Sequence, residues 1–220
     1  MIIGWHADGV PAVSRRTDSP NVPWWGLLST AAAPVLLIGG WTVAAARQQG
    51  GFDSFERTIS DLAALGADDR WLMTGALAGL GACHVTTAAA LRDAAPAGRA
   101  VLAAGGVATV LVAAFPLPAD ESGSTAHTIV AGTAFLALAV WPALAGRRSA
   151  PALLRPGPSA VAAATLLGLV AWFGVELASD EGGVGLAERV TAGAQALWPM
   201  AVAWGAAAAA RTGHGRGRRS

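Results

Sequence analysis

The chain has 220 residues, of which 54% are hydrophobic and only 13% are charged, with a formal net charge of +1. A typical soluble domain has roughly 25% charged residues, so this chain has too few charges to cover a soluble surface, and we expect a membrane protein. The low net charge argues against a nucleic-acid-binding protein, and the single cysteine excludes a disulfide framework or a thiolate metal cage.

Six apolar stretches are long enough to cross a bilayer, whose core of about 30 Å needs roughly 20 helical residues. In chain order they cover residues 24–46, 71–91, 100–117, 128–145, 159–178 and 191–210. Backbone polar groups find no water in a bilayer, so each stretch is predicted to be helical. The expected fold is all-α, a polytopic domain over 24–210 with six transmembrane helices in three hairpins, an N-terminal tail over 1–23 and a basic tail over 211–220.

The basic residues, all of them arginine, divide unequally between the two sides of this predicted bundle. Eleven of the 15 lie in the two tails and in the second and fourth loops, and the other four lie among acidic residues in or beside the first and fifth loops. Cytoplasmic segments carry the excess of basic residues. We therefore expect a bacterial inner-membrane protein with both termini in the cytoplasm.

The first outer loop, residues 47–70, is long and patterned. Phe52, Phe55, Ile59 and Leu62 recur at helical spacing, with Asp61 on the opposite side. This predicts a short amphipathic helix that lies on the outer surface or folds back over the mouth of the bundle.

Small residues mark where we expect helices to approach closely. Gly75 and Gly79 in the second stretch and Gly105 and Gly106 in the third permit such contacts, through which helices associate in lipid.

Polar side chains inside or beside the spans are functional candidates, because an ionisable group in hydrocarbon costs at least ~2.5–3.5 kcal/mol. Trp172 and Glu176 share one helical face, and a polar stripe in the sixth stretch begins at Glu188 and descends through Thr191, Gln195 and Trp198. If the outer loop closes over the same mouth, a chamber results. Its candidate catalytic residues are Glu176, Asp61, His127 and Glu188, and its candidate substrate-binding residues are Trp172, Trp198, Gln195, Arg189 and Ser60.

Each of these residues also has a purely structural interpretation. Charges at helix mouths are commonly solvated, Glu176 can reach outward to headgroups, and Ser60 with Asp61 can simply cap a helix. His84 lies past the midplane of the second span, about half a membrane from the other ionisable residues, and is expected to be structural. A zinc site is not expected, because only His84 and His127 lie in or next to the spans. A Ser60–His127–Asp61 triad is disfavoured because neighbouring helical side chains point about 100° apart.

Several short motifs resemble those of the bacterial and archaeal "domain of unknown function 998" family, in its high-GC bacterial branch. They are Arg57-Thr58-Ile59-Ser60-Asp61-Leu62 between two spans, Ala114-Phe115-Pro116 with His127 after it, Gly185-Leu186-Ala187-Glu188-Arg189, and Gln195-Ala196-Leu197-Trp198-Pro199. The likeness covers about residues 24–210. It implies a six-helix membrane protein and carries no settled activity.

The chamber suggests an intramembrane acid–base enzyme that acts on a lipid-soluble substrate, an isoprenoid or a lipid, as a membrane-bound cyclase or isomerase would. A carboxyl group among tryptophans is stabilised in its protonated form, so Glu176 or Asp61 is the expected acid. Trp172 and Trp198 would stabilise a cation, and His127 would be the base. No cofactor or metal and no nucleic-acid partner is expected. Two alternatives stay open, a non-catalytic partner or sensor subunit and a permease for a small molecule or lipid.

Overall fold

The computed structural model describes residues 22–120, 123–179 and 182–217, with side chains as far as Arg211. Most of the predicted N-terminal tail and the end of the predicted basic tail lie outside the described residues.

Six long helices make up the described chain. They are α1 (Trp24–Ala46), α2 (Trp71–Ala90), α3 (Pro96–Ala114), α4 (Thr125–Ala145), α5 (Pro156–Ala178) and α6 (Val184–Gly217), and two 3-10 helices, η1 (Ser60–Ala63) and η2 (Ala152–Leu154), lie in loops. No strand occurs among the described residues, and the predicted all-α fold is confirmed. Helices α3 and α5 begin earlier than predicted because Pro96 and Pro156 occupy the first turn, where a missing N–H costs nothing.

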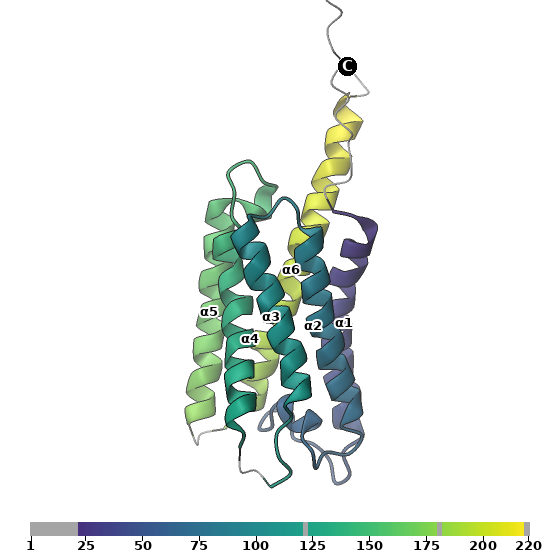
Figure 1. The fold of residues 1–220 in the computed structure, drawn as a ribbon, viewed down its shortest axis with the longest axis vertical. Coiled ribbons are helices and arrows are strands. Elements are labelled where there is room, and N and C mark those ends of the chain that lie inside the picture. The colour runs from purple at the N-terminus through teal and green to yellow at the C-terminus, as the bar shows by residue number, and fades with distance from the viewer. Residues whose placement is uncertain (1–21, 121–122, 180–181, 218–220) are drawn as a thin grey trace, which may run out of the picture.

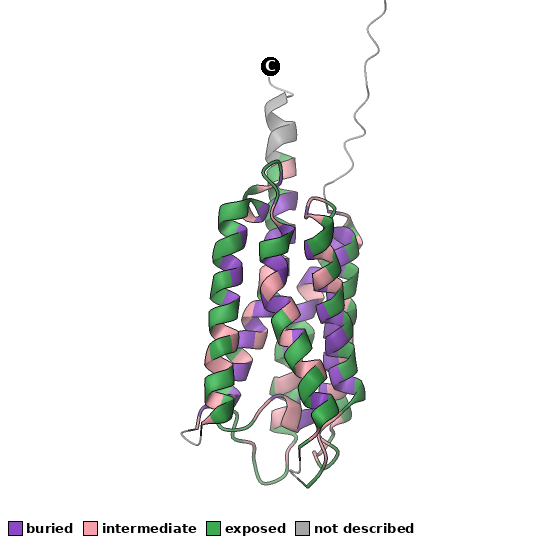
Figure 2. Cartoon of the chain, turned by 60° about the vertical axis from the view of Figure 1, so that its left-hand side comes forward, coloured by how far each residue is buried: buried purple, intermediate pink, exposed green. Residues whose placement is uncertain are grey.

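Five helices, α1 to α5, are long and apolar enough to cross a membrane. Their outward faces are apolar as well, since side chains such as Val35, Val161 and Val175 are 65–70% exposed, and exposed residues line the outside of the bundle in Figure 2. A soluble protein would not leave so large an apolar surface in water, and the chain is a membrane protein. Helix α6 runs beside the other five (Figure 1), but Gln195 and several weakly apolar residues interrupt it, and its role as a sixth span stays a prediction.

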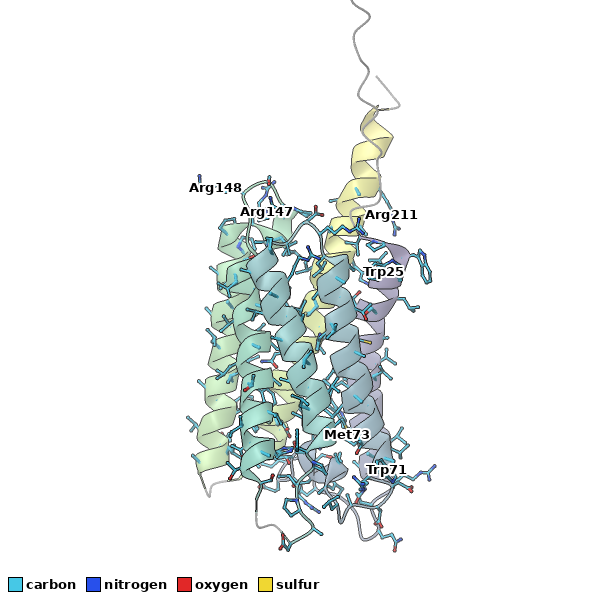
Figure 3. All side chains as sticks on the ribbon, viewed as in Figure 1. Trp25, Trp71, Met73, Arg147, Arg148 and Arg211 are labelled. Carbon is cyan, nitrogen blue, oxygen red and sulfur yellow. The ribbon has the colours of Figure 1, made fainter. Side chains whose placement is uncertain are left out.

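The helices run alternately up and down, each packed mainly on its neighbours in sequence, and α6 lies between α5 and α1. In Figure 1 loop residues 47–70, 115–120, 123–124, 179 and 182–183 lie together at the lower end, which we call the η1 end. The opposite end, which we call the arginine end, carries Arg147, Arg148, Arg211 and Trp25, while Trp71 lies at the η1 end (Figure 3). The two groups of arginines that the sequence distinguishes therefore lie at opposite ends of the bundle. Which end faces the cytoplasm stays a prediction.

A close helix crossing lies between α2 and α3, at Gly81, which was not predicted from the sequence. A Cβ added to Gly81 would lie 2.5 Å from the Gly106 carbonyl oxygen, and one added to Gly106 would lie 2.7 Å from that of Gly81. Gly106 therefore permits a close contact between helices, as predicted. Nothing lies within 4 Å of such a Cβ at Gly75, and at Gly79 it would meet only the flexible Leu36 side chain.

The fold of the first outer loop also differs from the prediction. Residues 52–59 fold into turns, and only η1 is helical, so the predicted amphipathic helix is wrong in most of its length. Asp53 starts the turns by accepting the N–H groups of Phe55 and Glu56. Ile59 and Leu62 are buried while Phe55 is exposed. The loop does fold back over the mouth of the bundle, because α6 binds its peptide groups.

Candidate functional site

A small cavity, here called the central cavity, lies inside the bundle in its η1 half. Its volume is about 50 Å³, and its walls come from α1, α2, α3, α4 and α6 and from the start of η1. Apolar side chains make up most of these walls. The polar lining residues are Ser60, His84, Thr109, Glu188 and Gln195.

A larger opening, here called the lateral groove, lies between α4 and α5. It has a volume of about 380 Å³, and Gly132, Phe135, Phe173 and Gly174 are among its apolar walls. The rings of Phe135 and Phe173 lie 5.1 Å apart between centroids. Gly132 and Gly174 are exposed on the outward surface, so the groove opens toward the lipid-facing side. Its inner end is polar and is formed by Thr58, Ser60, His127 and Glu188.

The groove and the cavity share a wall. Ser60 and Glu188 line both, together with Ala131 and Phe135. The half-buried hydroxyl of Ser60 and the carboxyl group of Glu188, which is 4% exposed, therefore lie between the lateral groove and the central cavity.

His127 is fixed at this wall from two sides. Ser124 caps α4 by accepting the N–H of His127, which places the residue in the first turn. The ring Nδ1 lies 2.8 Å from the Phe115 carbonyl oxygen, and Nε2 lies 3.1 Å from Ser60 Oγ. A carbonyl oxygen can only accept, so Nδ1 carries the proton, and Nε2 of the neutral ring accepts the hydrogen bond from the Ser60 hydroxyl.

Glu188 reaches the same wall from the first turns of α6. Its Oε2 accepts the N–H of Ile59, the residue before Ser60. Burial disfavours the charged form of a carboxyl group, and the neighbouring Arg189 favours it. The predicted inward stripe is confirmed for Glu188, Thr191 and Gln195, which are all buried, but Trp198 is only partly buried. Gln195 donates to the Phe135 carbonyl at 2.8 Å and thereby ties α6 to α4.

Residues 30–205 match the family described as "Protein of unknown function (DUF998)". The chain belongs to this DUF998 family. The matched region contains every residue of the shared wall, and the resemblance inferred from the short motifs is confirmed. No curated protein and no solved structure matches the chain.

Three predicted residues lie apart from the wall of this DUF998 protein. Glu176 accepts a hydrogen bond from Trp172 Nε1 at 2.9 Å, which confirms that the two share a face, but neither lines the groove or the central cavity. Trp198 lines a separate apolar groove between α5 and α6. The predicted tryptophan-walled chamber is therefore not what surrounds Glu188 and His127.

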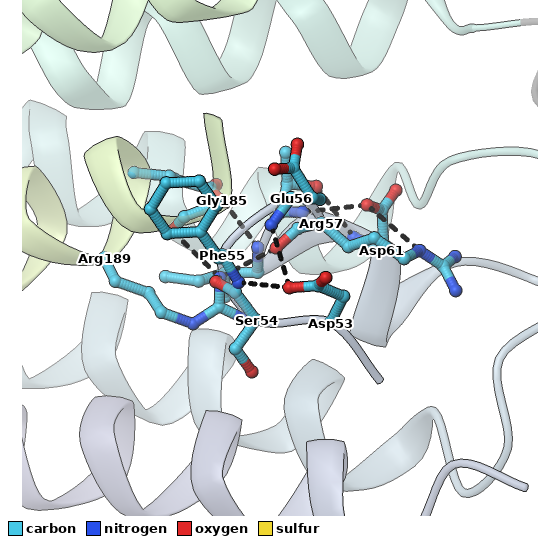
Figure 4. Close-up of polar contacts among 11 residues, drawn as sticks. Asp53, Ser54, Phe55, Glu56, Arg57, Asp61, Gly185 and Arg189 are labelled. Carbon is cyan, nitrogen blue, oxygen red and sulfur yellow. Dashed lines mark hydrogen bonds and ion pairs between the residues drawn. The ribbon is translucent and has the colours of Figure 1, made fainter. Parts of the chain in front are cut away.

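Asp61 and Arg189 hold the outer loop. Asp61 accepts the N–H of Thr58 at 2.9 Å, and Thr58 Oγ1 accepts the N–H of Asp61 at 3.1 Å, a reciprocal pair that starts η1. Arg189 donates to the carbonyl oxygens of Ser54, Arg57 and Gly185 (Figure 4). Asp61 therefore fits its structural interpretation, in which it holds a helix start. Arg189 is not the solvated charge that its structural interpretation describes, because it clamps the loop.

His84 is not isolated as the sequence analysis expected. It is 1% exposed and lines the central cavity with Glu188 and Gln195. Its Nδ1 is buried and has no hydrogen-bond partner among the described residues. Whether it is needed for function stays a prediction. No group of three His, Cys, Asp or Glu side chains that could hold a metal ion occurs in the part of the chain that the structure describes.

The sequence analysis missed the groove itself. Its walls are Phe, Gly and Leu side chains that are common in any transmembrane helix, so no pattern distinguished them. Thr58 at the inner end was not selected as a candidate either. The Phe115 carbonyl could not be predicted, because a backbone acceptor leaves no mark in a side-chain pattern.

Proposed function

We propose that this DUF998 protein is a membrane enzyme that performs acid–base chemistry on a lipid-soluble substrate. The observation that carries the proposal is the shared wall. Ser60, His127 and Glu188 meet at the inner end of an apolar groove that opens toward lipid, and Ser60 and Glu188 also face the central cavity, whose few other polar groups include His84 and Gln195.

The hydrocarbon part of the substrate would lie in the lateral groove and its polar end at the wall. Ligand pockets are commonly about 300–1,000 Å³ and mostly apolar, with few polar groups, and the groove of about 380 Å³ fits this description. The central cavity of about 50 Å³ is too small for such a molecule. Glu188 is the proton donor in this arrangement, and Nε2 of His127, whose neutral ring is held by Phe115, is the acceptor.

The narrower function suggested by the sequence, a cyclase or isomerase of an isoprenoid or lipid, takes a modified form. Its acid is Glu188, because Glu176 lies away from the groove. The aromatic faces available to a cationic intermediate are those of Phe135 and Phe173, which line the groove as Trp172 and Trp198 do not.

The arginine half of the bundle favours an enzyme over a permease. A permease needs polar groups along the whole route, and the polar lining of the central cavity extends no further than His84. Beyond it the core is mainly an apolar cluster that includes Leu102, Trp141 and Val202. The buried hydroxyls of Ser29, Thr30 and Thr87 there bond within and between α1 and α2 and line no described cavity.

The test is a lipidomic comparison of host cells with and without the gene, complemented by variants. We expect deletion to change the amount of at least one lipid or isoprenoid. The wild-type gene should restore it and Glu188→Gln should not. Gly174→Leu should also fail, because a Cβ at Gly174 meets nothing within 4 Å and the leucine would fill the groove.

Gly168→Leu is the matched control for this experiment. Gly168 lies on the same helix, has equally open space and lies away from the groove, so this variant should restore the lipid. Membrane levels of all variants are compared by immunoblot. An unchanged lipid profile on deletion, or full restoration by Glu188→Gln and Gly174→Leu, would reject the enzyme and favour a partner or sensor subunit.

A further inference from the structure

We infer that Ser60 is a nucleophile and that the substrate is a long-chain carboxylic ester, which the protein hydrolyses through an acyl-serine. The inference rests on the proposed function for the place of the hydrocarbon chain. It replaces the cyclase or isomerase reaction with ester hydrolysis, in which His127 transfers the protons, and it names the substrate class.

The first support is the geometry of Ser60 and His127. A nucleophilic serine needs a base within about 2.6–3.2 Å, and the base needs a third group that fixes its orientation. Ser60 Oγ lies 3.1 Å from Nε2 of His127, and the Phe115 carbonyl oxygen lies 2.8 Å from Nδ1. The third group is thus a backbone carbonyl. A Ser60–His127–Asp61 triad was disfavoured because neighbouring helical side chains diverge, and that objection does not apply to the Phe115 carbonyl.

The second support is a hydrogen-bond donor beside the serine. Thr58 Oγ1 lies next to η1 and accepts the N–H of Asp61 at 3.1 Å, so its own hydroxyl proton is available to another acceptor. Thr58 lines the same inner end of the lateral groove as Ser60. A donor in this place can stabilise the negative oxygen of a tetrahedral intermediate.

The third support is a place for water on the other side of Ser60. The central cavity of about 50 Å³ has room for a few water molecules, at roughly 10–15 Å³ each. Water there would find polar partners in Thr109, Glu188 and Gln195, and it would satisfy the buried Nδ1 of His84. Ser60 therefore lies between the groove that takes the ester and the cavity that takes the water.

The reaction follows from these positions. Ser60 Oγ attacks the ester carbonyl carbon, its proton passes to Nε2 of His127, and the carbonyl π electrons move onto the oxygen near Thr58. When the carbonyl re-forms, the bond to the leaving alcohol breaks and the alcohol takes the proton from Nε2. Water from the central cavity then attacks the acyl-serine, gives its proton to Nε2 and releases the acid, and Ser60 takes that proton back.

A fluorophosphonate with a dodecyl chain tests the nucleophile without knowledge of the natural ester. Phosphorus bonds to the serine oxygen and fluoride leaves. The purified full-length protein in nanodiscs should be labelled once, at Ser60, as located by intact mass and peptide mapping. Ser60→Ala should not be labelled. His127→Gln should be labelled at least about 100-fold more slowly, the contribution of a general base.

Two controls separate the site from reactivity elsewhere. Ser179→Ala removes a serine at the same end of the bundle, whose hydroxyl donates to the Glu176 carbonyl, and should be labelled like the wild type. Gly174→Leu should slow the dodecyl probe about tenfold and affect an ethyl probe much less, whereas Gly168→Leu should change neither.

Absence of labelling of the folded wild-type protein by both probes would overturn the inference, as would equal labelling of Ser60→Ala. Folding is checked by size-exclusion chromatography and thermal unfolding. The proposed function fails separately. If Gly174→Leu and Glu188→Gln still fail to restore the lipid while the probes do not label Ser60, a proton-transfer enzyme remains and only the nucleophile is rejected.

Discussion

Glu188 and Arg189, neighbours on α6, bind the same loop through opposite groups of its backbone. Glu188 accepts the N–H of Ile59, and Arg189 donates to the carbonyl oxygens of Ser54 and Arg57 at 2.9 and 2.7 Å. The pair therefore fixes the backbone that leads directly into Ser60. From the sequence, these two residues could be solvated charges at the mouth of a helix. In the structure they anchor the loop that carries Ser60.

Arg189→Met should loosen this loop. The methionine keeps the apolar stem but removes three hydrogen bonds to backbone carbonyls, each of which contributes roughly 0.5–1.5 kcal/mol. We expect unfolding to become easier by about 2 kcal/mol. Amide hydrogen exchange at residues 54–59 should become faster.

Arg57→Met is the control for that measurement. Arg57 lies 3.8 Å from Asp61 in a largely exposed ion pair, and such pairs contribute little. If Arg57→Met loosens the loop as much as Arg189→Met does, the anchor has been assigned to the wrong arginine.

Asp93, in the loop between α2 and α3, should make stability depend on pH. Burial raises the pKa of its carboxyl group, and Arg147 lowers it by a smaller amount. The folded state thus binds this proton more tightly than the unfolded state does, so stability falls as pH rises above the ordinary aspartate pKa of about 4. Asp93→Asn should therefore melt at a higher temperature than the wild type at pH 7, and the difference should vanish near pH 3.5. A difference that is the same at both pH values would contradict this explanation.

The sequence predicted the five confirmed spans and the inward stripe on α6 because both depend on local periodicity. Apolar length decides where a helix can cross lipid, and the spacing from Glu188 to Gln195 decides which side chains share a face. Neither depends on a distant partner.

The outer loop and the base of the site could not be predicted in the same way. Residues 52–59 have helical spacing, but their peptide groups bond to α6, more than a hundred residues away in the sequence. Ser60 and His127 are separated by 67 residues. The Phe115 carbonyl that orients the ring is a backbone group. From the sequence, Asp61 was the only candidate for the group that orients the His127 ring. In the structure Asp61 instead forms the reciprocal hydrogen bonds with Thr58 at the start of η1.

The orientation of the bundle can be tested with single cysteines in a Cys83→Ala background, because Cys83 is the only native cysteine. Asp120→Cys at the η1 end should react with a membrane-impermeant thiol reagent added to intact cells. Ala152→Cys at the arginine end should react only after the cells are permeabilised, because cytoplasmic loops carry the excess of arginine. Both positions are exposed. The reverse labelling pattern would place the η1 end inside.

Gly81→Ala should be among the most damaging small substitutions in the bundle. The added methyl group would lie 2.5 Å from the Gly106 carbonyl oxygen and 2.8 Å from the Val110 nitrogen. Both are backbone atoms, so no side chain can turn away to make room. We expect a loss of about 1–3 kcal/mol in the free energy of unfolding, as overpacking causes in a well-packed core. Thermal unfolding in detergent measures it.

Gly75→Ala on the same helix provides the matched comparison, because its methyl group would meet nothing within 4 Å. Alanine also favours a helix more than glycine does, so this variant should be as stable as the wild type or slightly more stable. The two substitutions add the same atoms to the same helix six residues apart. If both destabilise the protein equally, the loss comes from the helix itself and the close α2–α3 crossing is not its cause. If only Gly81→Ala does, the loss comes from the close contact between α2 and α3 at this glycine.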